Sequence, residues 1–122
     1  MQKPKKDPKR ERRITMEIIV DAYGPHEHAM GWYCYLEDRI QWFTAMCVEK
    51  RQISPLEVGD EVEVLGMAEV GECGHEMFVK IRWERHGLAV PLSQLKPIRS
   101  TEKEIKKAVE DWHYWVEMGY EF

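Results

Sequence analysis

Short segments of alternating apolar and polar residues between residues 42 and 98 constrain the fold of this chain most strongly. Residues 77–83 alternate strictly, which is the period of a β-strand. Arg85-His86-Gly87 predicts a tight hairpin turn with glycine at positive φ, and residues 88–92 predict the returning strand. Residues 42–48 and 60–65 predict further strands, and residues 97–98 a last short one after a single helical turn. Short strands with tight connections favour a small SH3-like β-barrel.

Helical periodicity flanks these strands on both sides. The spacing of apolar residues predicts a short helix from Ile14 that ends at 23–25, and a second helix over 26–39, with a strand over 32–36 as the alternative. A last helix opens at 100–104, where Thr101 and Glu104 have capping-box spacing. Gly119 suits the position just after its end. The expected fold class is α+β, an SH3-like β-barrel with N-terminal helices and a C-terminal helix.

Charge is distributed unevenly along the 122 residues. Residues 1–13 carry seven Lys or Arg and two acidic residues, a net charge of +5, so the rest of the chain carries −9 of the total −4. With two prolines and no apolar residue after Met1, residues 1–13 are expected to be a disordered basic tail. Residues 14–122 are expected to form a single acidic domain, which attracts cations and repels phosphate backbones.

Composition and motifs exclude several classes of protein. No apolar run approaches the roughly 18 residues that a membrane span needs, and three irregularly spaced cysteines (Cys34, Cys47 and Cys73) argue against a disulfide scaffold. We therefore expect a cytoplasmic protein with no membrane partner. The sequence has no nucleophile elbow, phosphate-binding glycine loop or H-E-x-x-H motif, so we do not expect an enzyme.

The sequence contains candidate ligands for two kinds of metal site. Cys73 and His75, two positions apart in a glycine-rich loop, are candidate zinc ligands, but zinc needs two more and no C-x-x-C is present. The carboxylates are better candidates for calcium, which takes six to eight oxygen ligands. An EF-hand loop is absent. Glu37 and Asp38 stand out, because adjacent carboxylates at a helix C-terminus meet an unfavourable dipole beside free carbonyls.

The five tryptophans and five tyrosines raise the alternative of an interaction module. Aromatic side chains stack on nucleic-acid bases, but here they occupy apolar helix and strand faces, where core packing explains them. Because the domain is acidic, nucleic acid is an unlikely partner except through the basic tail. A protein partner remains open.

Several stretches of residues 14–122 resemble one family. They are Val20-Asp21-Ala22-Tyr23-Gly24, Ala29-Met30-Gly31-Trp32-Tyr33, Tyr35-Leu36-Glu37-Asp38, Leu88-Ala89-Val90-Pro91-Leu92 and Asp111-Trp112-His113-Tyr114-Trp115-Val116 with Gly119-Tyr120. Their composition is unusual and their order is kept along the chain. They resemble the small acidic calcium-binding proteins first described in cyanobacteria, the CcbP family. The long basic tail is a departure from that family.

This resemblance implies a cytosolic protein that binds calcium without an EF-hand and buffers or sequesters it. It also implies acidic surface side chains as calcium ligands. In the matching Tyr-Leu-Glu-Asp stretch these are Glu37 and Asp38, with Asp38 as first choice. Asp21 and Glu27 are possible neighbours of that pair if the first two helices form a hairpin.

Overall fold

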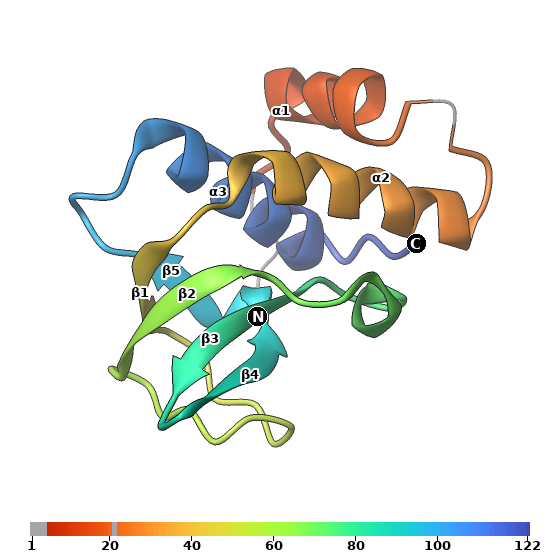
Figure 1. The fold of residues 1–122 in the computed structure, drawn as a ribbon. Helices are drawn as coiled ribbons and strands as arrows, with labels where there is room; N and C mark the ends of the chain where they lie inside the picture. Colours follow the sequence, from red (N-terminus) through yellow and green to blue (C-terminus); the bar gives the residue numbers. More distant parts are fainter. Residues whose placement is uncertain (1–4, 21) are drawn as a thin grey trace.

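The structure, a computed structural model, describes residues 5–20 and 22–122 as an α+β fold (Figure 1). Its elements are, in chain order, α1 (Pro8–Arg13), the π-helical turn η1 (Ile14–Ile18), α2 (Pro25–Arg39), β1 (Phe43–Cys47), β2 (Glu61–Met67), the 3-10 turn η2 (Val70–Cys73), β3 (Phe78–Trp83), β4 (His86–Pro91), the 3-10 turn η3 (Leu92–Gln94), β5 (Leu95–Pro97) and α3 (Lys103–Glu117). None of the described helices is long and apolar enough to cross a bilayer.

The strands form an antiparallel sheet in the order β4-β3-β2-β1-β5. Neighbouring strands follow one another along the chain except for β5, which returns to pair with β1, placing Cys47 opposite Leu95. Among the described residues no pairing joins β4 to β5, so the sheet is open. The α+β class is confirmed, whereas closure into an SH3-like barrel is not.

The hairpin between β3 and β4 turns earlier than the sequence predicts. Trp83 pairs with His86, so the two loop residues are Glu84 and Arg85. Glu84 has φ 54°, and Gly87 lies within β4. The prediction of Gly87 as the residue with positive φ is therefore wrong. Glycine at position 87 instead leaves room for the side chain of Lys80, which a β-carbon there would displace.

The helices form a layer over one face of the sheet, with α2 and α3 side by side and α1 outside them (Figure 1). Three tryptophans from α2 and α3 are buried in the core: Trp32 is fully buried, Trp112 is 1% exposed and Trp115 is 7% exposed. The rings of Trp32 and Trp112 meet edge to face at 5.1 Å between centroids. These aromatic residues pack the core, as predicted, and the alternative strand at 32–36 is wrong because those residues lie within α2.

The first helical segment ends earlier than predicted. It ends at Ile18, after Ile14 and Ile18 have been buried, and Gly24-Pro25 marks the start of α2 rather than the end of its predecessor. Proline is well suited to a first helical position because its fixed φ matches the helix and its missing N–H is not needed. In the middle of α2, a β-carbon on Gly31 would clash with the carbonyl of Ile18.

The disorder expected for residues 1–13 is wrong for residues 8–13, which form α1. Asp7 caps this helix by accepting a hydrogen bond of 3.1 Å from the backbone N–H of Arg10. Arg10 and Arg13 both pair with Asp111 of α3, whose side chain is fully buried. Residues 1–4 of the expected tail lie outside the described residues.

The two ends of α3 differ in how well the sequence predicts them. Thr101 makes no capping box: its N–H donates to the carbonyl of Ile98 (3.1 Å), so it lies in a turn before the helix, and Glu102 occupies the N-cap. Gly119 has φ 79°, as predicted. The N–H of Tyr120 bonds to the carbonyl of Trp115 and that of Gly119 to Val116, which is the Schellman pattern.

Candidate metal site

The last turn of α2 carries the two carboxylates that the sequence favours. Glu37 and Asp38 are both exposed, and the Asp38 side chain retains 80% of its accessible surface. The helix ends at Arg39, and Ile40 donates its N–H to Leu36. The carbonyls of residues 37–39 therefore fall among those that a helix leaves without internal partners. Two negative side chains thus stand at the negative end of a helix dipole, beside oxygen atoms able to bind a cation.

Tyr33, one turn before Glu37, connects this helix end to a second acidic segment. Its hydroxyl donates a hydrogen bond of 2.8 Å to the carbonyl of Ala68. The pKa of Tyr33 is raised to about 12, first by burial and then by the negative charges of Glu37 and Glu69. Glu37 on α2 and Glu69, just before η2, therefore both place negative charge in the neighbourhood of this hydroxyl, where α2 packs against η2.

Asp38 has a cationic neighbour that leaves most of its charge uncompensated. The Arg39 guanidinium approaches Asp38 at 3.5 Å, but it also lies over the ring of Tyr35 at 4.1 Å and bonds to the Tyr35 carbonyl at 3.3 Å. An exposed pair of this length contributes little. Arg39 thus interacts mainly with Tyr35, and Asp38 faces solvent.

The other two predicted site residues do not join this group. Glu27 is exposed in the first turn of α2, where its charge favours the helix dipole. Ten residues of helix separate it from Glu37, which is about 15 Å along the axis. Glu27 therefore lies at the opposite end of α2. Asp21 lies outside the described residues.

The remaining acidic clusters are largely occupied by protein partners. Asp111 is buried against two arginines, and the hydroxyl of Tyr35 donates to it at 2.6 Å. Glu76 forms a two-pronged pair with Arg51, at 2.8 and 3.2 Å. Asp60 accepts the N–H of Glu57 at 2.9 Å in a turn. These carboxylates hold the fold together, so the surface group at the end of α2 is the better metal candidate.

The available donors fit a hard cation better than zinc. Cys73 is 1% exposed, and burial raises the pKa of its thiol, which disfavours the thiolate that zinc requires. Among residues 5–20 and 22–122, no three His, Cys, Asp or Glu side chains converge as a ready-made metal cluster. Calcium also accepts carbonyl oxygens and water. Glu37, Asp38 and Glu69, with the carbonyls at the end of α2, supply this kind of donor.

Comparison with known proteins agrees with this donor chemistry. The sequence model of the CcbP family, described as calcium binding, matches residues 12–116. The chain belongs to the CcbP family. The crystal structure of Anabaena CcbP is 36% identical to it with a TM-score of 0.86, covering 100% of both chains. A calcium-binding protein in its calcium-binding form is also 36% identical, with a TM-score of 0.83 over 95% of both chains. No curated protein gives a significant match.

Membership of the CcbP family bears on two further predictions. The family is one of calcium-binding proteins and not of enzymes, in agreement with the missing catalytic motifs. Its model begins at Arg12, inside the segment expected to be a tail. Glu69 was not among the predicted site residues, because only the packing of α2 against η2 brings its segment near Tyr33.

Proposed function

We propose that this chain binds calcium at the surface group formed by Glu37, Asp38 and Glu69, without an EF-hand, and buffers or sequesters calcium in the cytoplasm. Membership of a calcium-binding family over residues 12–116 carries the proposal. The relative described in a calcium-binding form, alike over 95% of its chain, supports it. The position within the chain is supported by the hydrogen bond from the Tyr33 hydroxyl to the Ala68 carbonyl, which joins α2 to the residue next to Glu69.

The proposed mechanism is charge neutralisation at a helix end. Glu37 and Asp38 repel one another and the carbonyl end of α2, and a divalent cation removes this repulsion by accepting their oxygen atoms. Glu69 brings a carboxylate from outside the helix, which makes the site depend on the packing of α2 against η2. Carbonyls and water complete the six to eight oxygens. The chain supplies no catalytic group to this site, so the expected activity is binding alone.

Calorimetric titration with calcium, repeated with magnesium, tests the proposal. We expect saturable heat with calcium and weaker binding of magnesium, which demands a tighter octahedral site. The single variants Glu37→Gln, Asp38→Asn and Glu69→Gln should each lower calcium affinity by about tenfold or more, equivalent to roughly 1.4 kcal/mol. Glu61→Gln, an exposed carboxylate on β2, is the matched control and should leave the affinity unchanged.

Three results would contradict the proposal at different levels. Absence of heat with millimolar calcium would show that this chain has lost the binding activity of its family. Full affinity in all three variants would retain calcium binding but move it away from the end of α2. If Glu61→Gln lowers calcium affinity as much as Glu37→Gln does, the loss reflects the change in net charge and not a ligand at a specific site.

A further inference from the structure

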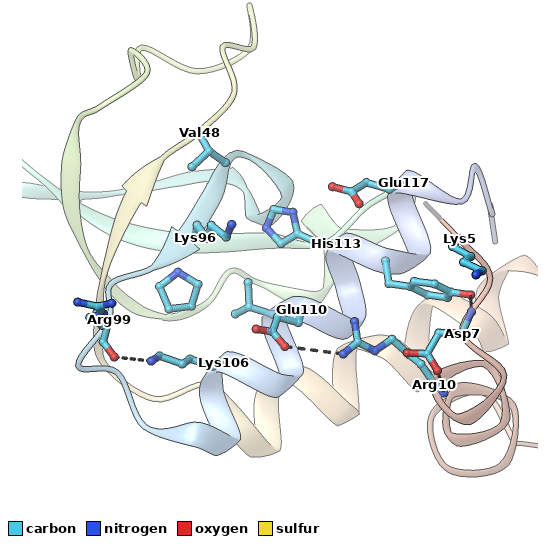
Figure 2. Close-up of a pocket in the computed structure, with 13 residues that line it drawn as sticks. Lys5, Asp7, Arg10, Val48, Lys96, Arg99, Lys106, Glu110, His113 and Glu117 are labelled. Carbon is cyan, nitrogen blue, oxygen red and sulfur yellow. Dashed lines mark hydrogen bonds and ion pairs between the residues drawn. The ribbon is translucent and has the colours of Figure 1, made fainter. Parts of the chain in front are cut away.

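A groove of about 650 Å³ lies between α1, β5 and α3 and is lined in part by basic residues (Figure 2). Its volume is within the range of small-molecule sites. Five lysines and arginines line it, against three carboxylates, although the whole chain carries more acidic than basic residues. The groove is therefore a local positive region on an acidic protein, and the calcium proposal assigns it no role.

Positive charge gathers at one end of this groove, which we call the basic end: Lys96 on β5, Arg99 after it and Lys106 on α3 (Figure 2). The Lys106 ammonium donates a hydrogen bond to the carbonyl of Arg99, which ties α3 to the strand that carries the other two cations. Among the described residues, neither Lys96 nor Arg99 forms an ion pair. Three cations from adjacent elements thus line one end of the groove without an ion pair among the described residues, although Glu110 lines the same groove.

The rest of the groove differs in character. Pro97 and Val48, which is 43% exposed, supply the apolar part of the lining, and further along the groove Glu110 pairs with Arg10 at 3.7 Å. Glu117 and Asp7 lie further along. An extended polyanion running through the groove would meet these carboxylates, which repel it. A compact molecule with its negative charge at one end and an uncharged body at the other avoids them.

We propose that the groove binds a small organic phosphate of the size of a nucleoside diphosphate. Its phosphates lie at the basic end, because lysine and arginine side chains form charge-assisted hydrogen bonds with phosphate oxygens. Its uncharged part lies against Pro97 and Val48. Lys96, Arg99 and Lys106 are the residues that hold the anion.

Calorimetric titration of the full chain with ADP, pyrophosphate and adenosine, in buffer with a chelator and no divalent cation, tests this proposal. We expect ADP and pyrophosphate to bind and adenosine not to bind. The double variant Lys96→Gln/Arg99→Gln should lower ADP affinity by about tenfold or more, while both exposed side chains can be replaced without opening the core. Lys103→Gln/Lys107→Gln removes the same charge from α3 outside the groove and should change affinity by less than about twofold.

Each other outcome overturns the proposal. No heat with ADP and pyrophosphate at millimolar concentration excludes a phosphate site. If the two double variants lose ADP affinity equally, at unchanged melting temperatures, binding is due to general electrostatic attraction and not to a site in the groove. A single-stranded oligonucleotide or an acidic peptide that binds more tightly than ADP and is lost in Lys96→Gln/Arg99→Gln assigns the groove to that macromolecule. Since calcium is absent throughout, none of these results bears on the calcium proposal.

Discussion

Asp111 shows how one buried carboxylate organises the N-terminal part of this protein. Its side chain is fully buried, forms ion pairs with Arg10 and Arg13, and accepts a hydrogen bond from the hydroxyl of Tyr35. Removing one member of a buried charge group leaves its partners without compensation, which costs more than the group's net contribution. The ion pairs are therefore expected to be needed for the fold even though replacing the whole group by apolar residues could be neutral.

Asp111→Asn is expected to lower the free energy of unfolding by about 3 kcal/mol, because two arginines lose their anion. Urea denaturation followed by circular dichroism measures this. Glu110→Gln is the matched control, since the side chain of Glu110 is 57% exposed and its pair with Arg10 should contribute less than about 1 kcal/mol. Equal effects of the two variants would show that burial of Asp111 does not matter.

At the scale of single residues, the sequence predicts which carboxylates are available better than it predicts their partners. Glu37 and Asp38 were found from their adjacency at a helix end, which is a local pattern. The effect of Glu69 on the pKa of Tyr33 depends on tertiary packing, so no spacing along the chain encodes it. The pairing of Asp111 could have been predicted from the sequence. A carboxylate beside Trp112 and Trp115 on an apolar helix face needs a cationic partner when it is buried.

Helix α2 and the turn η1 approach closely at one glycine. Helix propensity alone favours Gly31→Ala by about 1 kcal/mol. The new β-carbon would however clash with the backbone carbonyl of Ile18, and backbone cannot move aside as a flexible side chain does. We expect Gly31→Ala to lower the free energy of unfolding by about 2 kcal/mol or more.

Thermal unfolding measures this effect, with Gly74→Ala as control. Gly74 has φ −69° and open space where its β-carbon would lie, so its substitution should be nearly neutral. A Gly31→Ala protein as stable as the parent would show that η1 can shift away from α2 without cost.

Helix α1 should loosen in acid because of Glu11. Burial raises the pKa of Glu11, but hydrogen bonds from the hydroxyls of Tyr114 and Tyr120, each 2.6 Å long, prevail and lower it below 4.5. A carboxyl with a lowered pKa in the folded state stabilises the protein above its unfolded pKa, and this contribution is lost as pH falls through the folded value. The stability that Glu11 contributes is therefore lost below about pH 4.5.

Glu11→Gln should accordingly be less stable than the parent at neutral pH and should lose less stability between pH 5 and pH 3. Urea midpoints at a series of pH values measure both quantities. Glu17→Gln, an exposed carboxylate on η1, should follow the parent curve. If Glu11→Gln has the same acid slope as the parent, other carboxyls control the acid transition.

At the scale of elements, periodic patterns predict most of the fold. The ranges 26–39 and 77–83 nearly coincide with α2 and β3, because each has a long, regular apolar pattern. Errors occur at turns and ends: the β3–β4 turn, the start of α3 and the end of the first helix. Helix α1 was not predicted because a segment so rich in charge is expected to be solvated and disordered. In the structure, Arg10 and Arg13 are instead paired with Asp111, which is distant in the sequence.

Charge is distributed unevenly over the molecule. Five lysines and arginines line the groove between α1, β5 and α3, while Glu37, Asp38 and Glu69 stand at the end of α2 and beside η2. Self-repulsion among like charges destabilises a compact state, and a bound cation relieves it where the charges meet. Calcium is thus expected to stabilise the fold in proportion to its binding.

A ligand that binds the folded state alone stabilises it by about 2.7 kcal/mol at a hundred times its dissociation constant. For a domain of this length, that free energy corresponds to a rise in melting temperature of roughly 10 °C. Differential scanning calorimetry with calcium, magnesium and sodium chloride at equal ionic strength measures the specific part. Screening by salt acts on every surface charge and is the same for all three, whereas coordination requires oxygen ligands held together by the end of α2 and residue 69. A calcium-specific rise that disappears in Glu37→Gln/Asp38→Asn therefore places the ion at that helix end, and equal rises with all three salts mean that the acidic surface is only screened.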